Sequence, residues 1–170
     1  MHLSSSTQRS RFDFISIQGA SSTDSPTQFI ISITFIFMEG FAWFLHKYVM
    51  HGLGWFLHED HHRSSKGRLE KNDIFGLFFS LLSFLLIFTG FLGGFDIRFP
   101  IGIGVATYGI GYFLVHDTFF HRRIKIKYRP KSQYMKRVLH AHTIHHQKSK
   151  AHMGVCFGFL YAQKKYTPTD

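Results

Sequence analysis

The chain has 170 residues, with 20 Lys and Arg against 10 Asp and Glu, and a formal net charge of +10 at pH 7. The length favours one domain, and the single cysteine, Cys156, excludes an intrachain disulfide framework and a cysteine-held iron–sulfur cluster. The apolar residues are concentrated in three blocks, which favours a membrane protein over a soluble bundle.

The segment before the first apolar block, residues 1–27, is rich in Ser and Thr and lacks the apolar core of a secretory signal. We expect a loosely ordered polar tail here, and an organellar targeting signal stays open as an alternative. The remaining residues, 28–170, are expected to form the membrane domain.

The three apolar blocks cover residues 28–45, 74–94 and 100–115. As helices they would be about 27, 31 and 24 Å long, against roughly 30 Å for the hydrocarbon core of a bilayer. We therefore predict an all-α fold, an integral membrane bundle with about three transmembrane helices. Soluble core helices are the alternative, but helices of this length with almost no charge exceed what a small soluble core usually holds.

Basic residues follow the first and third blocks: Arg63, Lys66, Arg68 and Lys71 after the first, and a dense run at 121–137 after the third. Because Lys and Arg concentrate in cytoplasmic loops, both segments are predicted to be cytoplasmic and the N-terminus external. The basic run fits anionic lipid headgroups better than phosphates of nucleic acid, so no nucleic-acid partner is expected.

Ten of the thirteen histidines form four clusters with the spacings HxxxxH, HxxHH, HxxxxH and HxxHH. Imidazole is the commonest protein ligand for borderline transition metals, and ten are too many for one ion. Two octahedral-type ions with open positions could share about eight to ten nitrogens, so we predict a di-metal site on cytosolic helices. The histidines are His46, His51, His58, His61, His62, His116, His121, His142, His145 and His146.

The two kinds of spacing make different demands on a helix. Residues i, i+3 and i+4 of HxxHH point to one side of a helix, and Ser132 is a plausible N-cap for the helix that carries the last cluster. Five residues turn a regular helix by about 140°, so HxxxxH needs unwinding or another distortion to bring both side chains to one centre. His140 is rotated about 160° from His142 and is left out of the ligand set.

Carboxylates near the clusters are candidates for orienting the imidazoles. Glu39 lies inside the first apolar block, where a charge is costly unless it is protonated, paired or functional. We favour a role in which Glu39 accepts an imidazole N–H over direct coordination; a protonated helix-packing contact stays open. The same orienting role is open to the other acidic residues within or beside the clusters, which are Asp117, Asp60, Asp73, Glu59 and Glu70.

Several segments resemble the bacterial β-carotene 3-hydroxylases, within the fatty acid hydroxylase-like superfamily of membrane di-iron oxygenases. They are MEGFAWFLHKYVMHG (38–52), HEDHH (58–62), KGRLEKND (66–73), YFLVHDTFFHRR (112–123), HTIHH (142–146) and CFGFLYA (156–162). The resemblance implies that the ten histidines ligate two non-haem iron ions, without saying which ion each one binds. Together with the charge distribution, it implies the bacterial inner membrane, with the site on its cytoplasmic side.

The implied reaction is the O2-dependent hydroxylation of carbon 3 of the β-carotene ring, through β-cryptoxanthin to zeaxanthin. The sequence has no Gly-rich nucleotide fingerprint, so the electrons are expected from a ferredoxin or a flavin reductase. A sterol or fatty-acyl hydroxylase and a carotenoid ketolase stay open, as does a non-enzymatic, His-rich membrane protein that binds metal. Spacing does not identify the ion, and zinc competes with ferrous iron for nitrogen ligands.

Overall fold

The computed structural model describes residues 24–63, 69–127, 129–147 and 155–169, and these residues contain helices and no strand. The all-α prediction is therefore confirmed for this part of the chain. Of the predicted tail, residues 1–23 lie outside the described residues. The rest begins the first helix, because α1 spans Asp24–Phe44 and so starts four residues before the apolar block.

Three helical stretches are long and apolar enough to cross a membrane, as predicted: Pro26–Leu53, Asp73–Leu92 and Arg98–Phe120. The first consists of α1 and its continuation, and the second is α3 (Asp73–Leu92). The third begins with α4 (Arg98–Tyr112). On α3, Phe78, Leu81, Phe84, Phe88 and Leu92 are 48–67% exposed. Such a belt of large apolar side chains is a liability in water, whereas it matches the hydrocarbon of a bilayer.

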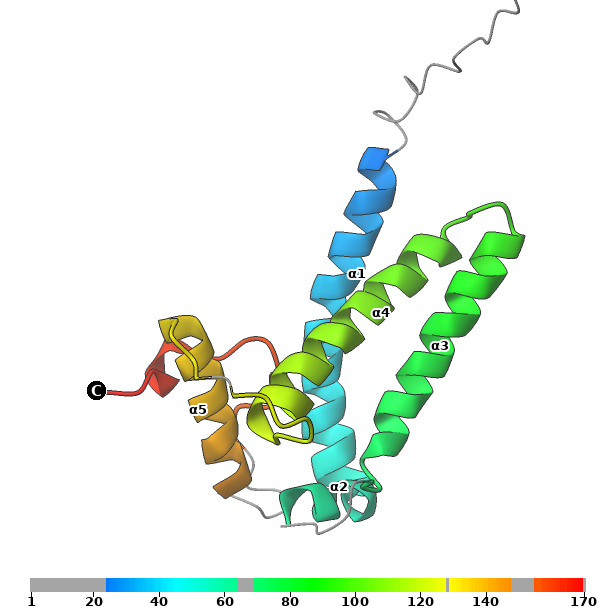
Figure 1. Ribbon diagram of the computed structural model, residues 1–170. Coiled ribbons are helices and arrows are strands. Elements are labelled where there is room, and N and C mark those ends of the chain that lie inside the picture. The colour runs from blue at the N-terminus through cyan, green and yellow to red at the C-terminus, as the bar shows by residue number, and fades with distance from the viewer. Residues whose placement is uncertain (1–23, 64–68, 128, 148–154, 170) are drawn as a thin grey trace, which may run out of the picture.

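Helix α4 lies between α1 and α3 and packs against both (Figure 1). Small residues allow this close approach: a Cβ on Gly102 would lie 2.8 Å from the backbone nitrogen of Ile87, and one on Gly104 would lie 2.9 Å from the carbonyl oxygen of Ile31. The hydroxyl of Ser83 donates to the carbonyl of Gly102 at 3.0 Å. Glycine at these positions therefore sets the distance between the membrane helices.

Two of the membrane helices continue as π-helices at the same end of the bundle. Helix α1 runs into η1 (Leu45–Leu53), which kinks at Gly52, and α4 runs into η2 (Phe113–Phe120). The short α2 (Trp55–His62) follows η1, and α5 (Gln133–Gln147) follows the basic run. A 3₁₀ turn, η3, covers Lys164–Tyr166. Helices α2 and α5 lie at the end opposite the short α3–α4 turn, so the histidine motifs gather at one end of the membrane helices (Figure 1).

The expected N-cap of α5 is present. The hydroxyl of Ser132 accepts a hydrogen bond from the backbone N–H of Met135 at 3.2 Å. Val138 and Ala141 then bury the inner face of α5 against Ala162, with Val115 and Tyr166 packed around them. This apolar contact holds α5 against η2 and the C-terminal segment, and so places the last histidine cluster.

Candidate metal centre

The π-helices bring the two HxxxxH pairs together. A π-helix hydrogen-bonds residue i to residue i+5, so residues five apart lie one above the other. In η2 the backbone N–H of His121 donates to the carbonyl of His116 at 2.9 Å, and the two ring centroids are 4.6 Å apart. In η1 the rings of His46 and His51 are 5.1 Å apart. The distortion that the spacing demands is therefore π-helical geometry.

The ten predicted histidines form two groups of five, and within each group the potential ligand atoms all lie within 4.8 Å of one another. Group 1 consists of His46, His51, His58, His62 and His145. Group 2 consists of His61, His116, His121, His142 and His146. The structure thus brings together every histidine that the spacing predicted, and it divides them in a way the sequence left open.

The division follows the internal repetition of the sequence. Each group takes one HxxxxH pair and the first and last histidines of the HxxHH motif that follows it. The middle histidine of each HxxHH motif crosses over, so that His61 of α2 joins group 2 and His145 of α5 joins group 1. Each half of the chain therefore supplies four side chains to one group and one to the other, which ties α2 to α5.

The outer nitrogens of several imidazoles are held by hydrogen bonds. Nδ1 of His46 donates to the carbonyl of Phe157 at 3.0 Å, and Nδ1 of His145 donates to the carbonyl of Val155 at 2.9 Å. Nδ1 of His61 faces Glu70 at 2.8 Å. Because a carbonyl or a carboxylate only accepts, these rings carry their proton on Nδ1 and present a lone pair from Nε2.

The inner nitrogens meet at distances that suit a cation. Nε2 of His61 lies 3.0 Å from Nε2 of His116, and Nε2 of His145 lies 3.1 Å from Nε2 of both His51 and His62. His61 and His116 both carry their proton on Nδ1, since each Nδ1 faces a carboxylate, so two lone pairs face each other with no proton between them. A metal ion between such atoms would replace this repulsion with two coordinate bonds.

Buried nitrogens without a partner point to the same conclusion. Among the described residues, Nε2 of His121, His142 and His146 is buried and has no hydrogen-bond partner. Buried polar atoms in folded proteins are nearly always paired, so three of them in one group call for a ligand. The donor set, made of neutral nitrogens, suits borderline ions such as iron and zinc, and the residues therefore fit the metal that the sequence predicts.

The protonation state also favours coordination. Burial lowers the pKa of His58 to about 4 and the pKa of His121 and His145 to about 3. Burial likewise lowers the pKa of His61 and His146, where neighbouring imidazoles add to the effect. These rings are consequently neutral at pH 7 and keep a lone pair for a metal.

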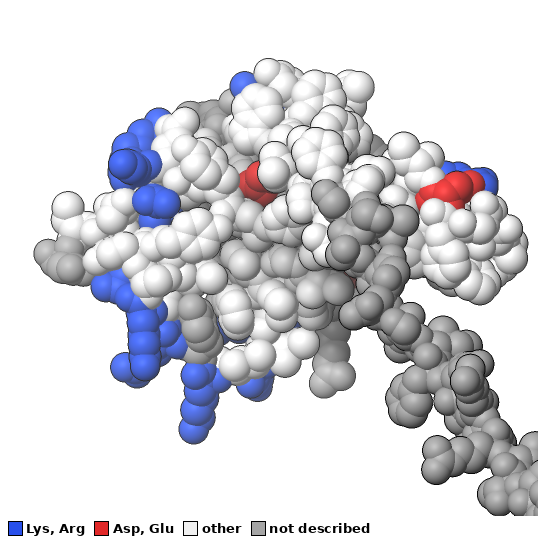
Figure 2. Space-filling view, turned by 90° about the horizontal axis from the view of Figure 1, so that it is seen from above, with Lys and Arg blue, Asp and Glu red and all other residues white. Residues whose placement is uncertain are grey.

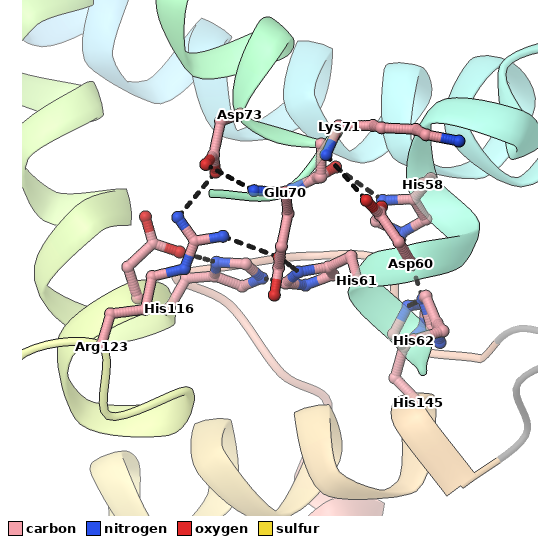
Figure 3. A network of polar contacts seen from close by, with 12 residues as sticks. His58, Asp60, His61, His62, Glu70, Lys71, Asp73, His116, Arg123 and His145 are labelled. Atoms are coloured by element: carbon pink, nitrogen blue, oxygen red, sulfur yellow. Dashed lines mark hydrogen bonds and ion pairs between the residues drawn. The ribbon is translucent and has the colours of Figure 1, made fainter. Parts of the chain in front are cut away.

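An acidic network supports group 2 (Figure 3). Oε2 of Glu70 accepts from Nδ1 of His61 at 2.8 Å and from the guanidinium of Arg123 at 2.7 Å, and Arg123 also pairs with Asp73 at 2.6 Å. Oδ1 of Asp117 accepts from Nδ1 of His116 at 2.8 Å. Of the predicted orienting carboxylates, Glu70 and Asp117 therefore contact a histidine directly, whereas Asp73 contacts Arg123 and the backbone N–H of Glu70.

Three other carboxylates lie differently from the expectation. Glu39 accepts from the hydroxyl of Tyr108 and from backbone N–H groups of residues 159–161, and its described hydrogen bonds do not include an imidazole. Asp60 accepts from the backbone N–H of Lys71 at 2.8 Å, and Glu59 pairs with Arg63. Closeness to a histidine in the sequence therefore did not predict which partners these carboxylates bind.

Sequence reasoning missed several partners of the imidazoles. Asn72 is buried, and its Oδ1 lies 2.7 Å from Nδ1 of His58. The carbonyls of Val155 and Phe157 carry no signal in the sequence, because every residue has one. Arg123 stands in the basic run, where surface charge was the simpler interpretation. His140, which was left out of the ligand set, instead faces the carbonyl of Tyr166 at 2.9 Å.

A family model described as fatty acid hydroxylase matches residues 31–162 of the chain. The chain belongs to the fatty acid hydroxylase family. The match covers most of α1, all of α3 and α4, both π-helices and all ten clustered histidines. As a member of this family of hydroxylases the chain is an enzyme, so a non-enzymatic metal-binding protein is no longer a candidate.

Curated relatives narrow the place of the chain within the fatty acid hydroxylase family. A β-carotene hydroxylase of Pantoea ananas is 44% identical over 133 residues, which are 78% of this chain and 75% of the relative. One of Pseudescherichia vulneris is 42% identical over 135 residues, 79% of this chain and 76% of the relative. One of a Paracoccus species is 37% identical over 138 residues, 80% of this chain and 85% of the relative. No solved structure matches the chain.

Proposed function

We propose that this enzyme hydroxylates carbon 3 of the β-ring of carotenoids, using two non-haem iron ions held by the two histidine groups. One observation carries the proposal: ten histidines converge in two groups of five at one end of three apolar helices. The named function of the bacterial relatives, at 37–44% identity, identifies the substrate class.

The chemistry explains why such a site is needed. A ring C–H bond is not acidic, so acid–base groups alone cannot break it, and bound iron with O2 supplies the oxidising power. In the overall reaction the C–H bond becomes C–OH, the second oxygen atom leaves as water, and two electrons and two protons come from outside the substrate. The protein's own contribution is to hold the imidazoles in the right tautomer and to bury them from water.

The position of the histidine groups suits a carotenoid. The hydrocarbon chain of β-carotene is confined to the bilayer, and the segments that carry the histidine groups lie where the membrane helices end (Figure 1). A site at this depth meets one end ring at a time. We therefore propose two separate visits of the substrate, the first giving β-cryptoxanthin and the second zeaxanthin.

The distribution of charge supports a proposal for where the electron donor docks. Exposed basic side chains lie in the segments on either side of α5, the helix that carries the last histidine cluster. They are Arg122, Lys125, Lys127, Arg129, Lys131, Lys164 and Lys165. Figure 2 shows Lys and Arg gathered at one side of the molecule, while most of the other described surface in this view is uncharged. We propose that the end with the histidine groups lies on the cytoplasmic side of the bacterial inner membrane, where an acidic ferredoxin or flavin reductase can dock.

The test is to express the chain in a bacterium that accumulates β-carotene and to separate the pigments by chromatography. The matched variants are His142→Ala, which removes a group 2 histidine, and His140→Ala, which removes a histidine of the same helix that belongs to neither group. We expect β-cryptoxanthin and zeaxanthin with the wild type and His140→Ala, and at least a hundredfold less with His142→Ala.

The other outcomes separate the alternatives. A ketocarotenoid would make the chain a ring ketolase, and unchanged β-carotene with membrane-inserted protein and a competent donor would point to a sterol or acyl chain. Equal loss of product in both variants would argue against the histidine groups as the site, since only one variant touches them.

A further inference from the structure

The two histidine groups differ in the hydrogen-bond acceptors that the outer nitrogens, Nδ1, of their imidazoles face. In group 2, two rings donate their Nδ1 proton to carboxylates: His61 to Glu70 and His116 to Asp117, each at 2.8 Å. Both carboxylates are shielded from water, since the side chains of Glu70 and Asp117 are 13% and 14% exposed. Their charge therefore acts on the imidazoles through a medium that screens it weakly.

In group 1 the acceptors described for three of the five rings are uncharged. Nδ1 of His46 and Nδ1 of His145 face backbone carbonyls, those of Phe157 and Val155. Nδ1 of His58 faces the side-chain oxygen of Asn72, at 2.7 Å. The two groups thus repeat the same histidine spacings with acceptors of different charge.

The charge behind an imidazole decides how strongly it binds a cation. A carboxylate that accepts the Nδ1 proton draws it partly away, which raises the electron density and basicity at Nε2. A carbonyl or amide does this less. Arg123 offsets part of the charge of Glu70, but it is also paired with Asp73, so the three acidic side chains outnumber the one guanidinium. The surroundings of group 2 therefore remain net negative, and those of the three described group 1 contacts remain neutral.

From this asymmetry we propose that group 2 is the tighter and more electron-rich of the two metal centres and takes up its ion first, with Glu70 and Asp117 as the positioning residues that make it so. The inference rests on the two-metal site proposed above. It makes the two ions inequivalent although each is offered five histidines, and it predicts a form of the enzyme with one ion per chain, filled in group 2.

The experiment measures metal binding, not activity. The metal-free protein, purified in detergent, is titrated anaerobically with Fe²⁺ in competition with a chelator of known affinity, and ⁵⁷Fe Mössbauer spectra are recorded at one and at two ions per chain. We expect two classes of site and a single iron environment at one ion per chain. Glu70→Gln and Asp117→Asn are expected to raise the dissociation constant of the tighter class by about 10–100-fold and to leave the weaker class unchanged.

Two further variants keep the test decisive. Asn72→Asp puts a carboxylate behind His58 of group 1 and is expected to tighten the weaker class, which general damage to the fold would not do. Glu59→Gln is the matched control, because this carboxylate lies on the same helix as His61 but pairs with Arg63, and neither class should change.

The results distinguish the inference from the function on which it rests. Failure of the wild type to bind Fe²⁺ would overturn both. Two ions bound with equal affinity, or a loss of the weaker class in Glu70→Gln and Asp117→Asn, would overturn only the asymmetry. If the carboxylate variants do not fold, an unchanged weaker class in Asn72→Asp overturns it as well.

Discussion

At the scale of single residues, Glu39 shows how a carboxylate in a membrane helix serves a site it does not touch. Its Oε1 accepts from the backbone N–H groups of Phe159 and Tyr161, and its Oε2 accepts from the hydroxyl of Tyr108. Glu39 thus joins the hydroxyl of Tyr108 on α4 to the backbone N–H groups of the C-terminal segment. This segment also carries the carbonyl of Phe157 and the ring of Phe159, which stacks on His46 at 4.8 Å.

Glu39→Gln should loosen this C-terminal segment. The amide oxygen can still accept from the backbone N–H groups, but it lacks the negative charge that strengthens these bonds, at a cost of about 1–3 kcal/mol in total. We expect faster hydrogen exchange of residues 155–163 by mass spectrometry, and a smaller effect for Tyr108→Phe, which removes one of the bonds. Thr107→Val is the control, because Thr107 lies next to Tyr108 on α4 and its hydroxyl donates to the carbonyl of Ile103 instead of to Glu39. Equal hydrogen exchange of residues 155–163 in Glu39→Gln and Thr107→Val would mean that Glu39 does not hold this segment.

At the scale of secondary structure, the two π-helices determine the site. Each π-helix continues a membrane helix from the point where the histidines begin. Its hydrogen bonds join residues i and i+5, which brings the two histidines of an HxxxxH pair to the same side of the helix. The kink at Gly52 then turns the chain into α2, where Gly54 packs against Val49: a Cβ on Gly54 would lie 3.0 Å from the Val49 carbonyl oxygen. The HxxxxH spacing therefore depends on the π-helical geometry to bring both histidines to one metal site.

This dependence can be tested by moving one histidine. Met50→His combined with His51→Met changes HxxxxH to HxxxH, the spacing that a regular α-helix would favour. In η1 it is residue 51, not residue 50, that lies with His46 in group 1, so we expect the double variant to lose group 1 metal as fully as His51→Met alone. Metal content per chain is the measurement. Wild-type metal content in the double variant would mean that an α-helical form of this segment also builds the site.

Much of this architecture can be predicted from the sequence, because it depends on local rules. Hydropathy identified the three membrane helices, and spacing identified every histidine of both groups. The division into groups could not be predicted, since it depends on how α2 faces α5 across long stretches of chain. The same holds for the role of Glu39, whose backbone partners lie about 120 residues away, and for carbonyl acceptors, which no side chain marks.

At the scale of the whole molecule, the excess positive charge and the histidine groups lie at the same end of the membrane helices. The α3–α4 turn at one end carries Asp96 and Arg98, which pair with each other at 2.6 Å. The opposite end carries the histidine groups and the exposed basic run. Because Lys and Arg concentrate in cytoplasmic loops, the excess of these residues at the histidine end supports the proposed orientation, and the charge-balanced turn does not oppose it. A cytoplasmic site could then receive electrons from a soluble donor while its substrate stays in the bilayer.

Labelling with a membrane-impermeant maleimide in intact bacteria measures this orientation. The wild type supplies the background, since burial raises the pKa of the Cys156 thiol to about 11 and slows its reaction. We expect Ile97→Cys, in the exposed α3–α4 turn, to be labelled in intact cells, and Lys131→Cys, in the basic run, to be labelled only after permeabilisation. Labelling of Lys131→Cys in intact cells would place the histidine groups outside the cytoplasm. A cytosolic donor could then not reach them, and the electrons would have to come through a membrane-bound carrier instead.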